Sequence, residues 1–336
     1  MEYVTLGKSD LKVSRICLGC MGFGDAGKGQ HSWTLGEEQS RAVIGAALDC
    51  GINFFDTAAA YQGGTCEEYV GRALRDAAKR GDYILATKFS VRSEREKAEG
   101  TDGARHVLNC LEGSLRRLGT DYVDLYICHM WDYGTPVEEI MRGLHEAVRQ
   151  GKVRYAGISN CFAWQLQKAN DIAERDGWQG FVTVQNHYNL LYREEEREMA
   201  ACCADGGVAM TPYSPLASGR LVKPAEEMTK RLAEDAYAKS KYDKTAAQDA
   251  VIVDRVAEIA EARGMSRIQV ALGWLLGKTA APVTGATKAS QITEAAKAAG
   301  VALTREETAY LEEPYVPHVP VGVMAENNGG KHMTVV

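Results

Sequence analysis

Four ionisable side chains occur where apolar segments of the chain give way to loops. Asp56, Lys88 and His129 each end a segment of the kind that forms a buried strand, and Tyr61 lies in the loop after Asp56. A free phenol, with a pKa of about 10, is a weak acid near neutral pH. A neighbouring ammonium group favours the phenolate, so Lys88, held in place by Asp56, is expected to lower the pKa of Tyr61.

Together these side chains predict a site that protonates a carbonyl oxygen while hydride arrives at the carbon. Tyr61 is the expected acid, and His129 is the expected second hydrogen-bond donor. A lone lysine after a strand is usually solvated, and a lone histidine is usually structural. The combination of all four residue types at strand ends is what favours chemistry here.

Two other reaction classes fit the residues less well. A Schiff-base aldolase needs a lysine of lowered pKa, whereas a carboxylate such as Asp56 raises the pKa of Lys88. A metal hydrolase needs closely spaced histidines, and the seven histidines show no such spacing. Cys17 and Cys20 lack a second ligand pair, so no metal site is predicted.

The elements that must position these side chains alternate regularly along the chain. An N-terminal hairpin is expected from residues 3–7 and 12–16. The strand-like segments after it are 16–19, 52–57, 83–88, 122–129, 153–159, 181–186, 208–214 and 281–285. The expected helices begin near Glu37 and Glu67 and then cover 104–118, 137–149, 164–175, 194–204, 268–276 and 289–299.

Strands without a polar face indicate a parallel sheet, and eight strand–helix units fit an α/β fold of the closed (β/α)8 TIM-barrel type. Extra helices or long loops are expected at the carboxyl-terminal face of the barrel. No linker divides the chain, so residues 1–336 are expected to form one domain. Residues 217–250 predict a partly helical lid or a mobile loop, and residues 325–336 a loose tail.

Gly22, Gly24 and Gly27 spell the GxGxxG pattern after the first barrel strand. A dinucleotide-binding fingerprint must open directly into a helix, whose N-terminus holds the pyrophosphate. Here the next helix-start signal is the capping-box pair Thr34 and Glu37, so a loop intervenes. The glycines therefore predict turns and flexibility in this loop.

Composition narrows the functional classes further. The 336 residues are 45% hydrophobic and 25% charged, enough for a large core, and the net charge of −6 without a basic run argues against nucleic-acid binding. The N-terminus has no apolar signal region, and no segment is long enough to span a bilayer. Nine scattered cysteines are typical of free thiols in a reducing compartment, so a cytoplasmic location is expected.

Several longer motifs are similar to the aldo-keto reductase superfamily and occur in its order. They are GINFFDTAAAY, ATK, SLRRLGTDYVDLYICH, GISN, VQNHYNLL, YSPLASGRL and PVTGATKASQI. The closing YLEEPYVPHVPVG resembles a bacterial and fungal subgroup. The resemblance implies NADPH-dependent reduction of an aldehyde or ketone, with Asp56, Tyr61, Lys88 and His129 as the catalytic tetrad and Tyr61 as proton donor.

The resemblance also implies where NADPH binds. At the nicotinamide end, the matching residues are Gly19, Cys20, Met21, Asp56, Ser159, Asn160, Gln185 and Tyr213. The loop around the pyrophosphate matches at Ser214, Leu216, Ser218, Gly219 and Arg220. The adenosine end matches at Gly285, Thr287, Lys288, Gln291 and Glu294. The Tyr213 ring is expected to stack on the nicotinamide, and Lys288, at a helix start, to bind the 2′-phosphate and favour NADPH over NADH.

The substrate pocket is expected to include Trp33, Met130 and Trp131, although the two tryptophans fit equally well as caps of the barrel. The family often has Trp-Pro after the catalytic histidine, so Met130 and Trp131 predict a differently shaped pocket.

His129, in place of the glutamate of the branch that reduces steroid double bonds, favours C=O chemistry. A second functional class stays open, namely a redox-sensing or regulatory subunit that binds NADPH and turns over slowly. The physiological substrate and the oligomeric state also stay open.

Overall fold

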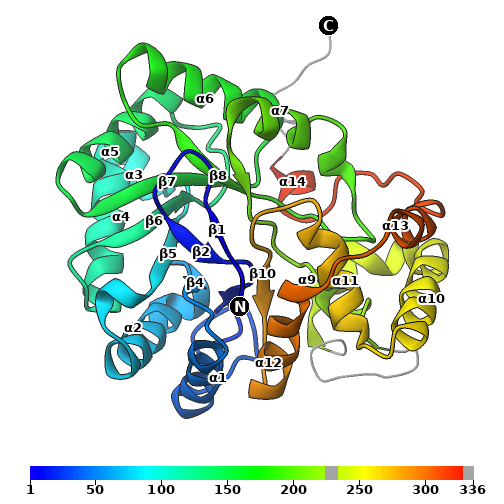
Figure 1. Cartoon of the computed structure of the whole chain (residues 1–336). Coiled ribbons are helices and arrows are strands. Elements are labelled where there is room, and N and C mark those ends of the chain that lie inside the picture. The colour runs from blue at the N-terminus through cyan, green and yellow to red at the C-terminus, as the bar shows by residue number, and fades with distance from the viewer. Residues whose placement is uncertain (224–233, 328–336) are drawn as a thin grey trace, which may run out of the picture.

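The computed structural model describes residues 1–223 and 234–327, and its centre is an eight-stranded parallel sheet (Figure 1). The strands are β3 (Cys17–Gly19), β4 (Phe54–Asp56), β5 (Ile84–Phe89), β6 (Val123–Cys128), β7 (Val153–Ser159), β8 (Phe181–Gln185), β9 (Ala209–Met210) and β10 (Val283–Gly285). Each predicted strand is present. Their order in the sheet is β10, β3, β4, β5, β6, β7, β8, β9.

The two outer strands of this order meet each other. The backbone N–H groups of Ala280 and Val283 donate to the carbonyls of Met210 and Pro212 at 3.0 and 2.9 Å. A parallel bridge also joins Tyr213 to Val283. The sheet therefore curls onto itself, and the predicted (β/α)8 barrel is confirmed.

Alternate residues of the strands pack into two different cores. Phe54 and Leu125 belong to a cluster that also holds Leu6 and Leu11 of the N-terminal chain. Phe55, directly after Phe54, instead packs in the cluster that the helices share. Both faces of each strand are thus apolar, as a sheet lined inside and covered outside requires. The predicted N-terminal hairpin is present as β1 (Tyr3–Thr5) and β2 (Lys12–Ser14), which pair antiparallel.

The helices that cover the strands follow the predicted segments closely. They are α1 (Glu37–Asp49), α2 (Thr65–Ala77), α4 (Gly103–Leu118), α5 (Val137–Arg149), α6 (Ala163–Arg175), α7 (Met199–Gly206), α11 (Arg267–Leu276) and α12 (Ala289–Lys297). The prediction of one helix over 194–204 was wrong, because a 3-10 turn, Glu194–Glu196, precedes α7. Glu195 in that turn is buried and accepts a hydrogen bond from Asn186 Nδ2 at 2.7 Å, which holds the turn against the barrel.

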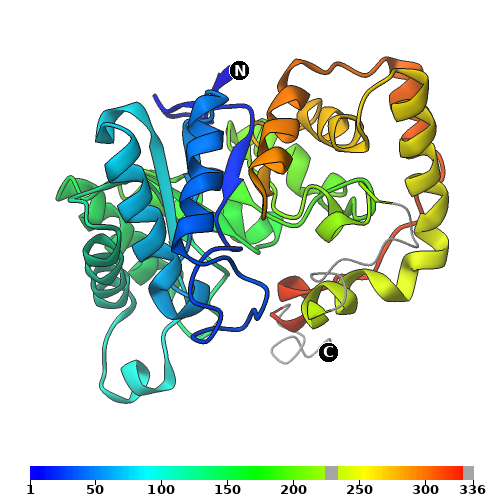
Figure 2. The same ribbon diagram turned by 90° about the horizontal axis from the view of Figure 1, so that it is seen from below.

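Several further helices were not individually predicted, although a partly helical lid and extra helices at the carboxyl-terminal face were expected. They are α3 (Glu94–Ala98), α9 (Ala236–Tyr242), α10 (Ala246–Ala262), α13 (Arg305–Glu312) and α14 (Val323–Glu326). Within the irregular segment 217–250, α9 and the start of α10 show helix, while residues 224–233 lie outside the described part of the chain. Figure 2 shows α14 beside α9, where the backbone N–H of Val323 donates to Tyr237 Oη at 3.1 Å.

The predicted tail is described only over its first residues. Residues 325 and 326 complete α14, and Asn327 Nδ2 donates to the Trp131 carbonyl at 2.7 Å. Residues 328–336 lie outside the described residues. In the part of the chain that the structure describes, no helix combines the length and apolar character needed to cross a bilayer.

Candidate active site

The strand register brings the predicted site residues to one end of the barrel. Gly19 pairs with Gly285 on one side and with Asp56 on the other, so three strand ends lie at one level. Farther round the barrel, Ser159 pairs with Gln185. The carboxyl ends of parallel strands are where (β/α)8 barrels carry their active sites.

The Lys88 ammonium is the centre of the predicted tetrad. The side chains of Lys88 and Asp56 are buried and form an ion pair, and Lys88 Nζ also donates to the Thr57 carbonyl at 2.9 Å. Its third contact is the Tyr61 hydroxyl at 3.3 Å. Burial acts to lower the pKa of Lys88, but the Asp56 carboxylate and the Tyr61 hydroxyl outweigh it and leave this pKa raised. Lys88 is therefore a permanent cation.

The rings of Tyr61 and His129 pack edge to face beside Lys88, with centroids 5.7 Å apart and planes at 79° to each other. Burial raises the pKa of Tyr61 to about 12, although the Lys88 charge acts to lower it. The expectation of a lowered pKa was therefore wrong, because desolvation outweighs the ammonium. Burial, helped by the Lys88 charge, lowers the pKa of His129 to about 3. At neutral pH the site holds a protonated phenol and a neutral imidazole.

A chain of hydrogen bonds links Asp56 to Tyr213. Gln185 Nε2 donates to Asp56 Oδ2 at 3.0 Å, and Ser159 Oγ donates to the Gln185 carbonyl at 2.6 Å. Asn160 Nδ2 then donates to Ser159 Oγ at 2.9 Å. Tyr213 Oη completes the chain by donating to Asn160 Oδ1 at 2.9 Å. Residues expected at the nicotinamide end thus form one connected network with the tetrad.

Behind Tyr213 lies a stack of aromatic rings that the sequence analysis missed. The His187 ring is nearly parallel to Tyr213, at 5.4 Å and 10°, and to Tyr192, at 4.3 Å and 11°. The Tyr242 hydroxyl lies 2.7 Å from His187 Nε2. Burial, followed by the Lys241 charge, lowers the pKa of His187 well below its usual value. This neutral stack holds the Tyr213 ring in one plane. Only its position two residues after Gln185 could have drawn attention to His187.

The expected pyrophosphate loop has an unusual backbone. Ser214, Ala217 and Ser218 have φ values of 55°, 48° and 56°, and Gly219 follows at 101°. Non-glycine residues in this region are uncommon and concentrate at ligand sites, and such turns leave concave surfaces suited to anions. One nitrogen of Arg220, Nη1, is buried with no hydrogen-bond partner among residues 1–223 and 234–327. An anionic diphosphate fits this loop.

The expected adenosine end lies around the start of α12. Gln291 Oε1 accepts hydrogen bonds from the backbone N–H groups of Thr287 and Lys288, at 2.8 and 3.1 Å. The Lys288 side chain is exposed and available to a ligand. Glu294 accepts from Ser266 Oγ at 2.7 Å and pairs with Lys297 at 2.8 Å. Gln291 and Glu294 are thus already held by neighbours, while the Lys288 side chain is exposed.

The first residues after β3 are also expected at the nicotinamide end. Met21 is half-buried, as a contact residue can be. Cys20 is fully buried, with its Sγ directed at the Leu18 carbonyl at 3.6 Å. Cys20 therefore has its thiol enclosed by the protein. Its backbone N–H donates to the Asp56 carbonyl at 2.8 Å, so its role in this structure is to join two strand ends.

Two glycines of the first loop, Gly24 and Gly29, pack against one buried side chain, Gln62. Its amide nitrogen donates to the carbonyls of Asp25 and His31 at 2.9 and 3.1 Å. A Cβ at Gly24, whose φ is 121°, would lie 2.7 Å from Gln62 Cβ, and one at Gly29 would overlap the Gln62 amide. Gly24 of the pattern and Gly29 beyond it are therefore packing requirements around the neighbour of Tyr61, a role that no local signal predicted, whereas a Cβ at Gly22 or Gly27 would meet Trp33 or Asp25 instead.

Helix α1 begins at Glu37, as predicted, but the predicted capping pair of Thr34 and Glu37 was wrong. Thr34 Oγ1 donates to the Gly24 carbonyl at 3.0 Å instead of capping the helix. The helix begins after Gly36, whose N–H donates to Gln39 Oε1 at 3.2 Å. Thr34 thus ties the first loop together, which is why its hydroxyl is not available as a cap.

The three residues expected to line the substrate pocket lie in loops at the same end. Trp33 is buried and packs beside His31, with centroids 5.0 Å apart. Trp131 is buried and meets the exposed Trp164 at 5.8 Å, edge to face. Met130 is half-buried. The structure therefore places an aromatic pair at Trp131, with Trp164 as a neighbour that the sequence analysis did not consider.

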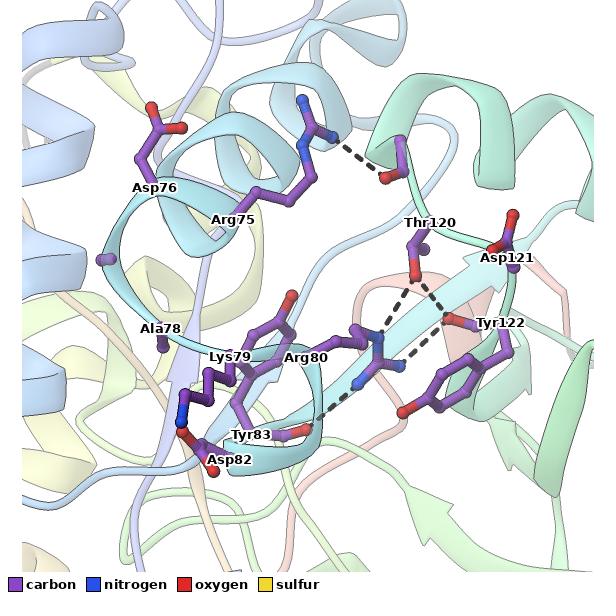
Figure 3. A pocket seen from close by; sticks show the side chains of 12 residues that line it. Arg75, Asp76, Ala78, Lys79, Arg80, Asp82, Tyr83, Thr120, Asp121 and Tyr122 are labelled. Carbon is purple, nitrogen blue, oxygen red and sulfur yellow. Dashed lines mark hydrogen bonds between the residues drawn. The ribbon is translucent and has the colours of Figure 1, made fainter.

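A cavity of about 930 Å³ lies elsewhere, where the chain enters β5 and β6 (Figure 3). Arg80 is one of the residues that line it. The Arg80 guanidinium donates to the carbonyls of Tyr83 and Tyr122 and pairs with Asp124 at 2.7 Å. Because strand-initial loops lie at the opposite end from the tetrad and the Arg80 cation is already engaged, this cavity is not the candidate active site.

Comparison with known proteins agrees with this geometry. The Aldo/keto reductase family model matches residues 15–315. Versiconal hemiacetal acetate reductase of Aspergillus parasiticus is 41% identical over 338 residues, covering 94% of this chain and 98% of that protein. Aldo-keto reductase dtxS3 of Metarhizium robertsii is 37% identical over 341 residues, covering 94% and 92%. A crystal structure of the thermostable aldo-keto reductase Tm1743 with the inhibitor epalrestat has a TM-score of 0.74 at 28% identity, covering 94% of this chain and 100% of that one. The chain belongs to the aldo/keto reductase family of oxidoreductases.

Proposed function

We propose that the protein catalyses the reversible, NADPH-dependent reduction of a small aldehyde or ketone to the alcohol, with Tyr61 as proton donor. The observation that carries this proposal is the Lys88 ammonium, which pairs with Asp56 and contacts the Tyr61 hydroxyl at 3.3 Å. The family as a whole supports carbonyl reduction and a nicotinamide cofactor. The choice of NADPH rests on Lys288.

The residues present fit such a cofactor. The left-handed turns of residues 214–219 and the buried Arg220 Nη1 suit a diphosphate. The Tyr213 ring, held by Asn160 and His187, suits a flat nicotinamide. When bound, the reduced nicotinamide supplies the hydride that arrives at the carbonyl carbon.

Tyr61, Lys88, Asp56 and His129 supply the proton transfer to the carbonyl oxygen. With a pKa near 12, the Tyr61 phenol is protonated at neutral pH and can donate its proton to the carbonyl oxygen. The phenolate that remains is stabilised by Lys88, which Asp56 keeps charged and oriented. His129 is neutral, so its N–H can donate a hydrogen bond to the same carbonyl oxygen. In the reverse direction, the Tyr61 phenolate accepts the proton of the alcohol.

The pocket and the setting of the enzyme are part of the proposal. Trp33, Met130 and Trp131 are proposed to line the substrate pocket, with Trp164 at its rim. All nine cysteines are free thiols in the structure, which supports a reducing compartment such as the cytoplasm.

Tyr61→Phe tests the assignment of the acid. We expect kcat for aldehyde reduction to fall by about 10²- to 10⁴-fold, because the carbonyl oxygen loses its proton donor. The Kd for NADPH should change little, since the phenyl ring remains. Activity is followed as NADPH absorbance with a panel of aldehydes, in both reaction directions.

The matched control is Tyr69→Phe, a half-buried tyrosine on α2, which should keep normal kcat. A near-normal kcat in Tyr61→Phe would contradict the role of Tyr61. Tight NADPH binding without turnover of any aldehyde or ketone would instead support the regulatory alternative.

A further inference from the structure

The segment after β9 brings a buried cation to the expected pyrophosphate loop. Lys241, in α9, is 5% exposed, and its Nζ lies 3.3 Å from Ser214 Oγ. Ser214 directly follows Tyr213, the residue expected beneath the nicotinamide. The ammonium therefore lies where the nicotinamide end of the cofactor site passes into the pyrophosphate end.

Three tyrosine rings surround this ammonium. Its Nζ lies 5.3 Å from the ring centroid of Tyr213, 4.9 Å from that of Tyr237 and 5.5 Å from that of Tyr242. Ring faces attract cations, and more strongly where water is excluded. Because these contacts already restrict the side chain, little rotamer entropy remains to be lost when it binds a ligand.

Arg220 places a second cation at one of these rings. Its guanidinium carbon lies 5.0 Å from the Tyr242 centroid, and Nη2 pairs with Asp243 at 2.6 Å. The other nitrogen, Nη1, is the buried atom without a hydrogen-bond partner among the described residues. Lys241 and Arg220 thus both lie at the Tyr242 ring, and an anion bound beside the two cations would be attracted to both.

We propose that Lys241 donates a hydrogen bond to the pyrophosphate of the cofactor, beside Ser214 and Arg220. This inference rests on the proposed function and deepens it, because it adds a binding residue from α9, outside the motifs that carry the family resemblance. It also assigns a purpose to the aromatic surroundings of Lys241, which hold the ammonium toward Ser214.

The test compares Lys241→Met, which keeps the length of the side chain, with Lys241→Arg, which keeps the charge. NADPH affinity is measured by quenching of tryptophan fluorescence. We expect Lys241→Met to raise the Kd for NADPH by about ten- to a hundredfold, the usual effect of losing a hydrogen bond to a charged group. Lys241→Arg should raise it much less. In steady state, KM for NADPH should rise while kcat stays nearly unchanged.

Adenosine 2′-monophosphate is the discriminating ligand, because it carries the 2′-phosphate and lacks the pyrophosphate. Its Kd should be the same in the unaltered protein and in Lys241→Met. The matched control is Lys244→Ala, an exposed lysine close by in the chain, which should bind NADPH normally. Thermal melting checks that each variant is folded, and Lys241→Gln serves as a second neutral variant.

The outcomes separate the two proposals. Unchanged NADPH affinity in Lys241→Met and Lys241→Gln would contradict the role of Lys241 and leave the proposed function intact. Equal losses for NADPH and adenosine 2′-monophosphate would also contradict it, since they would indicate general damage to the site. Failure of the unaltered protein to bind NADPH would contradict the proposed function itself.

Discussion

At the scale of single residues, burial and one fixed charge give the tetrad side chains different protonation states. Desolvation raises the pKa of Tyr61 to about 12 and lowers that of His129 to about 3, and the Lys88 charge opposes the first shift and adds to the second. Tyr61 therefore keeps its proton at neutral pH, beside the charged Lys88, until a group that accepts the proton is bound next to it. Activity at neutral pH therefore does not require a phenolate at rest.

The proposed preference for NADPH also rests on one side chain. Lys288 is exposed at the start of α12, where a cation and the helix N-terminus both favour an anion. We expect Lys288→Ala to weaken NADPH binding by about ten- to a hundredfold and to leave NADH binding nearly unchanged. Fluorescence titration with both cofactors measures the ratio.

Lys79→Ala is the control for this change, because Lys79 is an exposed lysine lining the cavity of Figure 3, away from the tetrad. An unchanged ratio of NADPH to NADH affinity in Lys288→Ala would count against a 2′-phosphate contact.

At the scale of elements, His106 ties α3 to α4. His106 Nδ1 lies 2.7 Å from Glu96 Oε1, and Nε2 lies 2.7 Å from the Ser90 carbonyl. Burial acts to lower the pKa of His106, but bonds to the Cys110 thiol, Glu96 and Ser90 outweigh it and raise this pKa to about 9. Burial acts to raise the pKa of Glu96, but bonds from His106 and Ser93 lower it to about 2. The pair is therefore an imidazolium–carboxylate bridge at neutral pH.

This bridge predicts a particular dependence of stability on pH. The folded pKa of His106 lies above the unfolded value of about 6.5, so its contribution is complete below pH 6.5 and is lost as the pH rises through about 9. It is lost again as the pH falls from about 4.5, the unfolded pKa of Glu96, through about 2, where folded Glu96 takes up a proton. His106→Gln should reduce the free energy of unfolding by up to about 3 kcal/mol near pH 6 and by much less at pH 10. Urea denaturation at a series of pH values measures both, and a difference that is independent of pH would exclude the charged bridge.

At the scale of the whole molecule, two of the outer helices pack so closely that a single glycine is needed at their contact. A Cβ at Gly71, in α2, would overlap the carbonyl oxygen of Leu118, the last residue of α4. Gly71→Ala should therefore force the two helices apart and reduce the free energy of unfolding by about 1–3 kcal/mol. Gly45, within α1, has no atom within 4 Å of the corresponding Cβ position.

Gly45→Ala is thus a control that should change the free energy of unfolding in the opposite direction. It should increase the free energy of unfolding by about 0.5–1 kcal/mol, because alanine restricts the unfolded chain and favours helix. Urea denaturation of both variants tests the pair. Equal effects in the two variants would show that helix propensity, and not helix packing, decides the outcome.

The amino-acid pattern was sufficient to predict the barrel and the residues at the ends of its strands. Eight apolar segments without a polar face leave few alternatives to a parallel barrel, and the end of each strand is a local property of the chain. Asp56, Lys88 and His129 could therefore be assigned to one end of the barrel without knowledge of any contact. The family motifs extended this assignment to the cofactor loops.

Which groups meet, and which protonation states they adopt, could not be predicted before the folded contacts were known. The pKa of Tyr61 rises because desolvation, a property of the folded interior, exceeds the effect of one nearby charge. Gln62 and Lys241 come from segments without a recognisable pattern, whereas His187 lies within one of the family motifs. Each acquires its surroundings from residues far away in the sequence. Local periodicity reports which side chains are buried. It does not report which buried side chains become neighbours, because that depends on how the loops pack across the end of the barrel.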